Sequence, residues 1–235
     1  MNTRLLRRLH RWIALGFSLV VFASAGSGVI HIVMARTQAP PPKAGASGGE
    51  AAVFDPGAWK LSPADAVKAS QVAGVTGINL RIIGGEPWYV IRGKGKMAYV
   101  NGADGRIGAD EDALFAREIA ARFLHCDRDE ARQTAYLTAY TTEYINIFRL
   151  LPVYRFDRDD GKGTRVYVST ATESVTRATD DGKQFEANLF ANVHKLMFLP
   201  NRDARDGALL FLMGGLLLAS ALGIALFFVT RSRKE

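Results

Sequence analysis

Cysteine is almost absent from this chain, which has one, Cys126, among 235 residues. A single cysteine excludes an intramolecular disulfide framework, a cysteine-rich zinc or iron–sulfur site, and CxxCH attachment of a c-type haem. His125, Cys126 and Asp127 are predicted to form an ordinary loop rather than a metal site, because ligands adjacent in a loop rarely converge on one ion without partners elsewhere. The chain also lacks a phosphate-binding loop, a dinucleotide fingerprint and a nucleophile motif, so we expect no NAD or FAD binding by the chain alone.

Acidic residues are scarce at both ends of the chain. Residues 1–11 contain four arginines and no acid, and residues 230–235 contain three cations and one acid. These two ends hold most of the net charge of +7, so the long middle of the chain is nearly neutral. A nucleic-acid interface needs cations clustered on the folded part, and the sequence therefore predicts no nucleic-acid partner.

Charged residues are absent from two long apolar segments, residues 12–34 and residues 207–229. As a helix, each would cross about 30 Å of hydrocarbon, so both are predicted transmembrane helices in contact with the lipid bilayer. Cations precede the first segment and follow the second. Because positive charge marks the cytoplasmic side, we expect an inner-membrane protein with both termini cytoplasmic and its main domain periplasmic.

A cleaved signal peptide is a second interpretation of the N-terminus. Residues 1–25 contain a basic start, an apolar run and Ala23-Ser24-Ala25 as a cleavage site. The apolar run continues to Val33, beyond the usual length for a signal peptide, which favours an uncleaved anchor. The sequence leaves both interpretations open.

The chain after the first apolar segment begins with a linker. Residues 35–53 are rich in proline, glycine, serine and alanine, a composition typical of a flexible tether. Residues 54–109 then predict a folded unit, in which Ser62 and Pro63 open a helix that ends near Gly74. Glycine turns separate the strand patterns that follow. These strands are predicted at residues 78–83, 88–92 and 97–100.

Residues 110–182 repeat this order of elements, with a helix after Asp110 and then more strands. The strands are predicted at residues 134–140, 144–148, 153–156 and 165–169. Three positions recur at equal spacing: Tyr99, Val100 and Ile107 in the first unit, and Tyr167, Val168 and Val175 in the second. This recurrence indicates an internal duplication. The predicted fold class is α+β: two transmembrane helices flank two tandem units, each a helix packed on an antiparallel sheet.

The strand and turn sequences of the first unit resemble a PepSY domain. They read Trp88-Tyr89-Val90-Ile91-Arg92 and Tyr99-Val100-Asn101-Gly102-Ala103-Asp104-Gly105-Arg106-Ile107. The second unit resembles a second copy of this domain. Its corresponding sequences are Pro152-Val153-Tyr154-Arg155-Phe156 and Tyr167-Val168-Ser169-Thr170-Ala171-Thr172-Glu173-Ser174-Val175. In that copy Glu173 stands where the family pattern has a turn glycine. The resemblance implies two PepSY-like units in the periplasm, residues 54–109 and 110–182.

The flanking segments are similar to the PepSY-associated transmembrane family. Its motifs are matched by Leu9-His10-Arg11-Trp12 and by Val193-His194-Lys195-Leu196. The second motif lies in residues 183–206, which are predicted to form an amphipathic juxtamembrane helix. Some members of this family are haem-containing inner-membrane reductases that act on ferric siderophores. The resemblance therefore implies haem b and iron uptake, although those enzymes have four spans and this chain has two.

Two histidines are the predicted metal ligands of such a haem. His31 is an intramembrane imidazole, and Ser24, Ser27 and Gly28 on its helical face would let a flat porphyrin come close. His194, on the predicted juxtamembrane helix, lies at about the same depth as His31. Two imidazoles on opposite sides of one iron make the b-type haem site used for electron transfer.

His10 is a third candidate cofactor-binding residue. It lies roughly 31 Å of helix from His31, so the two cannot bind one haem, although a symmetric dimer could pair His10 with its own copy. Structural interpretations stay open for all three histidines. His31 could form a hydrogen bond across the helix pair, His194 could lie at the membrane interface, and His10 could contact a lipid headgroup.

Two functions follow from these features. The first is a haem-b electron-transfer component linked to reduction of periplasmic ferric siderophore iron, acting as a homodimer or within a larger membrane complex. The second is a non-enzymatic, membrane-anchored module that binds or regulates a periplasmic protein, as a peptidase-inhibitor-like or assembly subunit. Whether the protein is an enzyme stays open, since no residue is predicted to be catalytic.

Overall fold

The computed structural model describes residues 3–38, 55–148 and 150–231. The chain divides into two compact units, which are described separately. The helical unit comprises residues 1–40 and 182–235, and the two-sheet domain comprises residues 41–181. Most of the predicted linker, residues 39–53, lies outside the described residues.

Two long helices dominate the helical unit. They are α1 (Thr3–Thr37) and α5 (Arg202–Arg231), and both are long and apolar enough to span a membrane. Only 6% of the residues in the most apolar window of each helix are buried, so neither is the core helix of a globular domain. The apolar segments predicted at residues 12–34 and 207–229 therefore lie inside helices of membrane-spanning length.

A shorter helical segment lies between them in the chain and packs against α1. It consists of α4 (Asp181–Leu189) and the π-helical turn η3 (Phe190–His194). The prediction of one helix over residues 183–206 is wrong, because Leu196 adopts a left-handed backbone with φ 51°. The chain then turns before α5 begins at Arg202.

The two-sheet domain starts with η1 (Pro56–Ala58) and α2 (Pro63–Ser70). Ser62 caps α2, because its hydroxyl accepts a hydrogen bond from the Asp65 backbone N–H at 3.2 Å. The first sheet follows in the antiparallel order β1 (Gly77–Ile83), β2 (Glu86–Gly93), β3 (Lys96–Asn101) and β4 (Ile107–Gly108). The helix and the first three strands were predicted, and β4 was not.

The second sheet follows α3 (Glu111–Leu124) and has the same simple order. Its strands are β5 (Arg132–Leu137), β6 (Val153–Asp157), β7 (Arg165–Ser169) and β8 (Ser174–Thr179). The strand predicted at residues 144–148 is wrong, since this stretch holds the 3-10 turn η2 (Asn146–Phe148) within the β5–β6 connection. The strand β8 was missed. A helix followed by a four-stranded antiparallel sheet therefore occurs twice.

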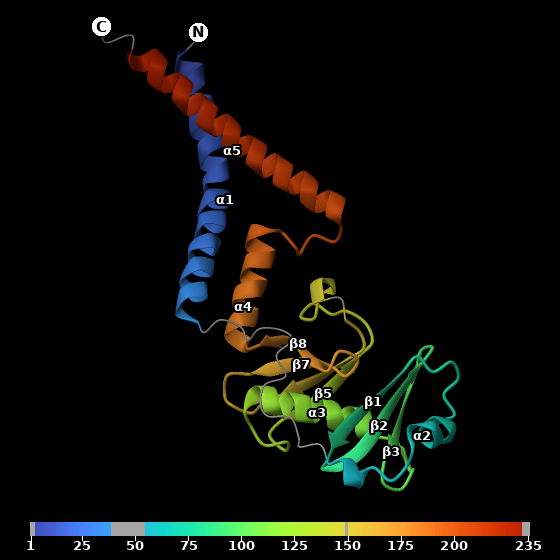
Figure 1. Ribbon diagram of the computed structural model, residues 1–235. Helices are drawn as coiled ribbons and strands as arrows, with labels where there is room; N and C mark the ends of the chain where they lie inside the picture. Colours follow the sequence, from blue (N-terminus) through green and yellow to red (C-terminus); the bar gives the residue numbers. More distant parts are fainter. Residues whose placement is uncertain (1–2, 39–54, 149, 232–235) are drawn as a thin grey trace. The chain divides into compact units, whose positions relative to one another are not determined.

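The helix α3 lies between the two sheets and is shared by them (Figure 1). One continuous core joins Trp88 and Val90 of the first sheet, Phe115 and Ile119 of α3, and Phe156 and further buried residues of the second sheet. The opposite face of the first sheet is covered by α2. The layers are thus α2, first sheet, α3 and second sheet, so the two repeats of a helix and a sheet form one domain rather than two.

The two sheets repeat in detail at their last hairpin. Val100 pairs with Ile107 in the first sheet, and Val168 pairs with Val175 in the second. Five residues after the first valine of each pair, the backbone is left-handed: Gly105 has φ 79° and Glu173 has φ 55°. The predicted equivalence of the two units therefore holds at this turn, where the structure places a non-glycine residue in a glycine-favouring conformation.

Glu173 is held in that conformation by ion pairs with the first sheet. Its carboxylate accepts from the Arg81 guanidinium at 2.8 and 2.5 Å, and Arg92 lies 3.6 Å away. The glutamate that departs from the PepSY-like turn pattern therefore links the β7–β8 turn to β1 and β2.

Candidate functional site

The histidines predicted as ligands lie in the helical unit, and each contacts an oxygen on another helix. His31, near the C-terminal end of α1, pairs through Nδ1 with the Glu186 carboxylate of α4. The Glu186 side chain is 17% exposed and the His31 side chain 47%. Sequence reasoning missed Glu186, although it precedes Phe190 and His194 by one and two helical turns and so shares a face with them.

His194 reaches α1 from the π-helical turn. Its Nδ1 lies 3.3 Å from the Ser24 hydroxyl and 3.5 Å from that of Ser27. Ser27 is buried, and its own hydroxyl proton is donated to the Ser24 carbonyl at 2.9 Å. The Ser27 oxygen can therefore only accept from the imidazole, which favours a proton on Nδ1 of His194. Ser24 and Ser27, which were predicted to make room for a porphyrin beside His31, instead contact His194.

Phe190 separates the two imidazoles. Its ring stacks on His31 with centroids 4.9 Å apart and an interplanar angle of 28°. The Phe190 ring also stacks on His194, with centroids 4.6 Å apart and an interplanar angle of 12°. The Lys195 ammonium lies 5.3 Å from the same phenyl centroid. His31 and His194 are therefore brought near each other, but with a third ring between them.

This stack does not fit a haem shared by His31 and His194. An axial imidazole donates its lone pair in the plane of its ring, so two axial ligands must point at one iron along a common line. Rings stacked nearly parallel on a phenyl ring direct their lone pairs along different lines. In the described part of the chain, no group of three or more His, Cys, Asp or Glu side chains could hold a metal ion. The haem stays a prediction.

His10 joins the other pair of helices. Its Nδ1 donates to the Ala219 carbonyl of α5 at 3.1 Å, and its ring packs on Gly223, where an added Cβ would lie 3.1 Å from Cε1. A Cβ at Gly215 would similarly lie 2.0 Å from Phe17. The small residues of α5 thus let α1 approach closely, and His10 is a contact between the two helices.

The two-sheet domain carries a groove where β1 and α3 end. The groove has a volume of about 830 Å³ and is lined by Ile82, Gly85, Glu118, Ala121, Arg122, His125, Cys126, Asp127, Arg128 and Glu130. The Glu118 carboxylate fixes one wall, because it accepts from the Gly84 N–H at 2.8 Å and pairs with Arg128 at 3.0 Å. Charges of both signs rim the groove.

The predicted loop at residues 125–127 is the C-terminal cap of α3. His125 has φ 51°, and the Cys126 N–H donates to the Ala121 carbonyl at 3.1 Å, as in a Schellman motif. Burial raises the pKa of the Cys126 thiol above its ordinary value. This segment therefore ends a helix and lines the groove.

Comparison with known proteins gives no assignment: no protein-family model, curated protein or solved structure matches the chain. The geometry of the described residues is therefore the basis for the function.

Replacing Glu186 with leucine tests the contact between α4 and α1. Loss of a charge-assisted hydrogen bond at a half-exposed site costs about 1 kcal/mol, so amide exchange over residues 185–195 should become about fivefold faster. Hydrogen exchange with mass spectrometry of the full chain in detergent measures this change. Asn192→Ala is the matched control, because the Asn192 amide only donates to Asn188 of its own helix. Equal exchange in Glu186→Leu and wild type would contradict a role for this contact.

Proposed function

We propose that the protein is a non-enzymatic, membrane-anchored binding module of the inner membrane. In this proposal α1 and α5 span the bilayer with both termini in the cytoplasm. The PepSY-like two-sheet domain then lies in the periplasm, where it binds an extended segment of a partner protein along β1. The observation that carries the proposal is the regular outer edge of β1 beside the groove at the end of α3.

The strand β1 has the properties of a docking edge. All seven of its residues pair in register with β2 without a bulge. It is the first strand of its sheet, and within the described ranges no strand pairs with its outer edge. Leu80, in the middle of the strand, is 39% exposed. The Leu80 carbonyl already accepts from the Arg81 guanidinium at 2.6 Å, so a peptide strand added here would displace this bond, pair with the backbone of the outer edge and place alternate side chains on each face.

The groove supplies the specificity that backbone pairing lacks. Ile82 and Gly85 bring the end of β1 into the groove, so a segment lying along β1 would reach it. Its lining includes the apolar Ala121, and the lining residues Arg122 and Glu130 can select charged side chains of the partner. A short patterned peptide, with backbone pairing and one anchoring end, fits this arrangement better than a small molecule does.

A photo-reactive residue at Leu80 tests this proposal in the full chain. We expect p-benzoylphenylalanine at position 80 to form an adduct with a periplasmic protein in living cells. The same residue at Ile107, which is 55% exposed on the opposite edge strand β4, should form none. The purified complex should show slowed amide exchange over β1, and Arg122→Glu should reduce the adduct. Equal cross-linking at both positions, or unchanged exchange over β1, would contradict edge docking.

A second candidate function is electron transfer with a haem b ligated by single imidazoles. It is favoured by one observation: the Nδ1 atoms of His10, His31 and His194 each contact an oxygen, and no described residue hydrogen-bonds to their Nε2 atoms. This arrangement is typical of metal-ligating histidines. Because the ring stack does not fit a shared iron, the second ligand would come from another copy or another membrane subunit. When bound, the haem would supply one-electron transfer toward periplasmic ferric siderophores.

The visible spectrum of the detergent-purified full chain, expressed with ample haem, tests this candidate. If His31 is a ligand, we expect a Soret band that His31→Ala abolishes and His125→Ala, in the two-sheet domain, leaves intact. A preparation without a Soret band ends this candidate and leaves the binding module unaffected.

A further inference from the structure

The connection between β5 and β6 is the main difference between the two repeated units. In the first sheet, only Gly84 and Gly85 connect the equivalent strands β1 and β2. In the second sheet the connection comprises residues 138–152, here called the β5–β6 loop. A long insertion at one turn of a repeat points to a purpose that the fold itself does not require.

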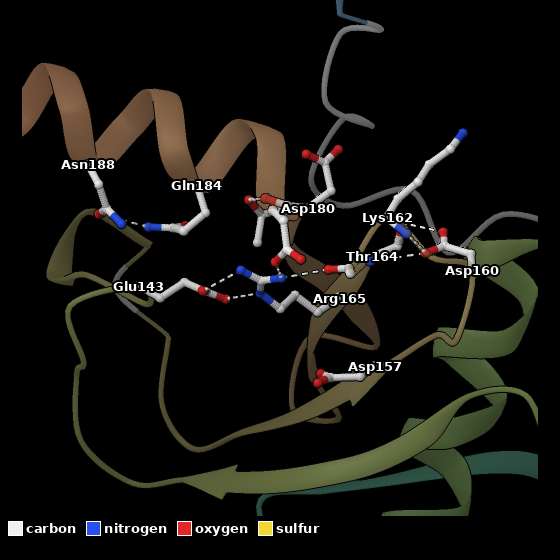
Figure 2. A network of polar contacts seen from close by, with 12 residues as sticks. Glu143, Asp157, Asp160, Lys162, Thr164, Arg165, Asp180, Gln184 and Asn188 are labelled. Atoms are coloured by element: carbon white, nitrogen blue, oxygen red, sulfur yellow. Dashed lines mark hydrogen bonds and ion pairs between the residues drawn. The ribbon is translucent and has the colours of Figure 1, made fainter.

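The base of the β5–β6 loop is fixed to the second sheet. Tyr144 is fully buried, and its hydroxyl bonds to the Leu150 carbonyl and to Thr176 Oγ1, each at 2.9 Å. The Glu143 carboxylate accepts from Arg165 Nε at 2.8 Å and from the Tyr167 hydroxyl at 2.5 Å. Figure 2 shows the Glu143 and Arg165 side chains pointing toward each other. The loop is therefore an anchored structure.

The charge of Glu143 is retained in this setting. Burial by itself would raise the pKa of Glu143, but the hydrogen bonds from Arg165 and Tyr167 and the Arg165 charge hold it below its ordinary value. The carboxylate thus stays ionised and turned toward the sheet at neutral pH.

The tip of the loop is apolar and exposed. The tip comprises residues 145–147, in which Ile145 is 42% exposed and Ile147 69%. Tyr140, near the start of the loop, is 44% exposed and stacks on Tyr144 with ring centroids 6.3 Å apart. Within residues 138–148 the only charged side chain is Glu143, which faces Arg165. The 3-10 turn η2 lies at this tip. The anchored base thus presents an uncharged apolar tip to the surroundings.

The base of the loop is also tied to the point where the chain leaves the two-sheet domain. Besides Glu143, Arg165 pairs with Asp181 at 2.6 Å. Asp181 is the last residue of this domain, and only residues 182–201 separate it from α5. One arginine therefore joins the loop base to the start of a short segment that leads to a helix of membrane-spanning length.

We propose that the tip of the β5–β6 loop inserts into the outer leaflet of the lipid bilayer. Isoleucine gains by leaving water, and tyrosine favours the headgroup region, where its ring and hydroxyl meet different surroundings. This inference rests on the proposed membrane insertion of α1 and α5.

The test uses the full chain in nanodiscs of phosphatidylethanolamine and phosphatidylglycerol. In a Cys126→Ser background, an environment-sensitive fluorophore is attached to Asn146→Cys at the tip. We expect a blue-shifted emission that doxyl lipids quench and aqueous iodide does not. Replacing both Ile145 and Ile147 with aspartate should abolish the blue shift and the lipid quenching.

Two control positions separate the outcomes. The label at Leu218→Cys, on an exposed position of α5, should be quenched by doxyl lipids, and the label at Gly161→Cys, in the β6–β7 turn, only by iodide. Quenching by lipid at 218 but not at 146 would overturn the loop inference alone. A blue shift at 146 without lipid quenching would place the tip against protein and overturn it too. No lipid quenching at 218 would overturn both the loop inference and the membrane insertion on which it rests.

Discussion

The two-sheet domain depends on one helix being buried from two sides. Phe115, Ala116, Ile119 and Ala120 of α3 are almost inaccessible to solvent, because the first sheet covers one side of the helix and the second sheet the other. The hydroxyls of Tyr99 and Tyr154, one from each sheet, donate to the Asp112 carboxylate at 2.6 and 2.8 Å. Burial and this shared hydrogen bond raise the pKa of both tyrosines. Neither small sheet could bury its inner face alone, so the positions of β1 and the β5–β6 loop follow from α3.

The histidines have an analogous role in the helical unit. His10 binds a carbonyl of α5, His31 a carboxylate of α4, and His194 two hydroxyls of α1. Each contact gives the imidazole a hydrogen-bond partner, because an unpaired polar ring among apolar helices is costly. The phenyl ring of Phe190 completes the contact between α4 and α1. These contacts account for the histidines as structural links between helices. They use the Nδ1 atoms, and no described residue hydrogen-bonds to the Nε2 atoms.

Features with a local cause could be predicted from the sequence, and features with a distant cause could not. The apolar segments, the Ser62 cap and the glycine turns act within a few residues, and the two long helices, α2 and the strands β1–β3 were predicted from them. Residues 144–148 were predicted to form a strand, but the Tyr144 hydroxyl bonds to Leu150 and Thr176, which holds this stretch in a loop. The ion pair of Glu186 with His31 joins distant parts of the chain, and no spacing rule indicates it. The stacking of Phe190 depends on the π-helical turn, which the sequence pattern does not reveal.

The central claim is that the two end helices hold the two-sheet domain on the outer side of a membrane, and the single cysteine tests it directly. Cys126 lies at the surface groove of this domain and is the only thiol of the chain. We predict that a membrane-impermeant maleimide added to intact spheroplasts labels Cys126. A cysteine placed at Ser232 in a Cys126→Ser background should react only after lysis. Protection of Cys126 until lysis, with labelling at position 232 from outside, would contradict the account.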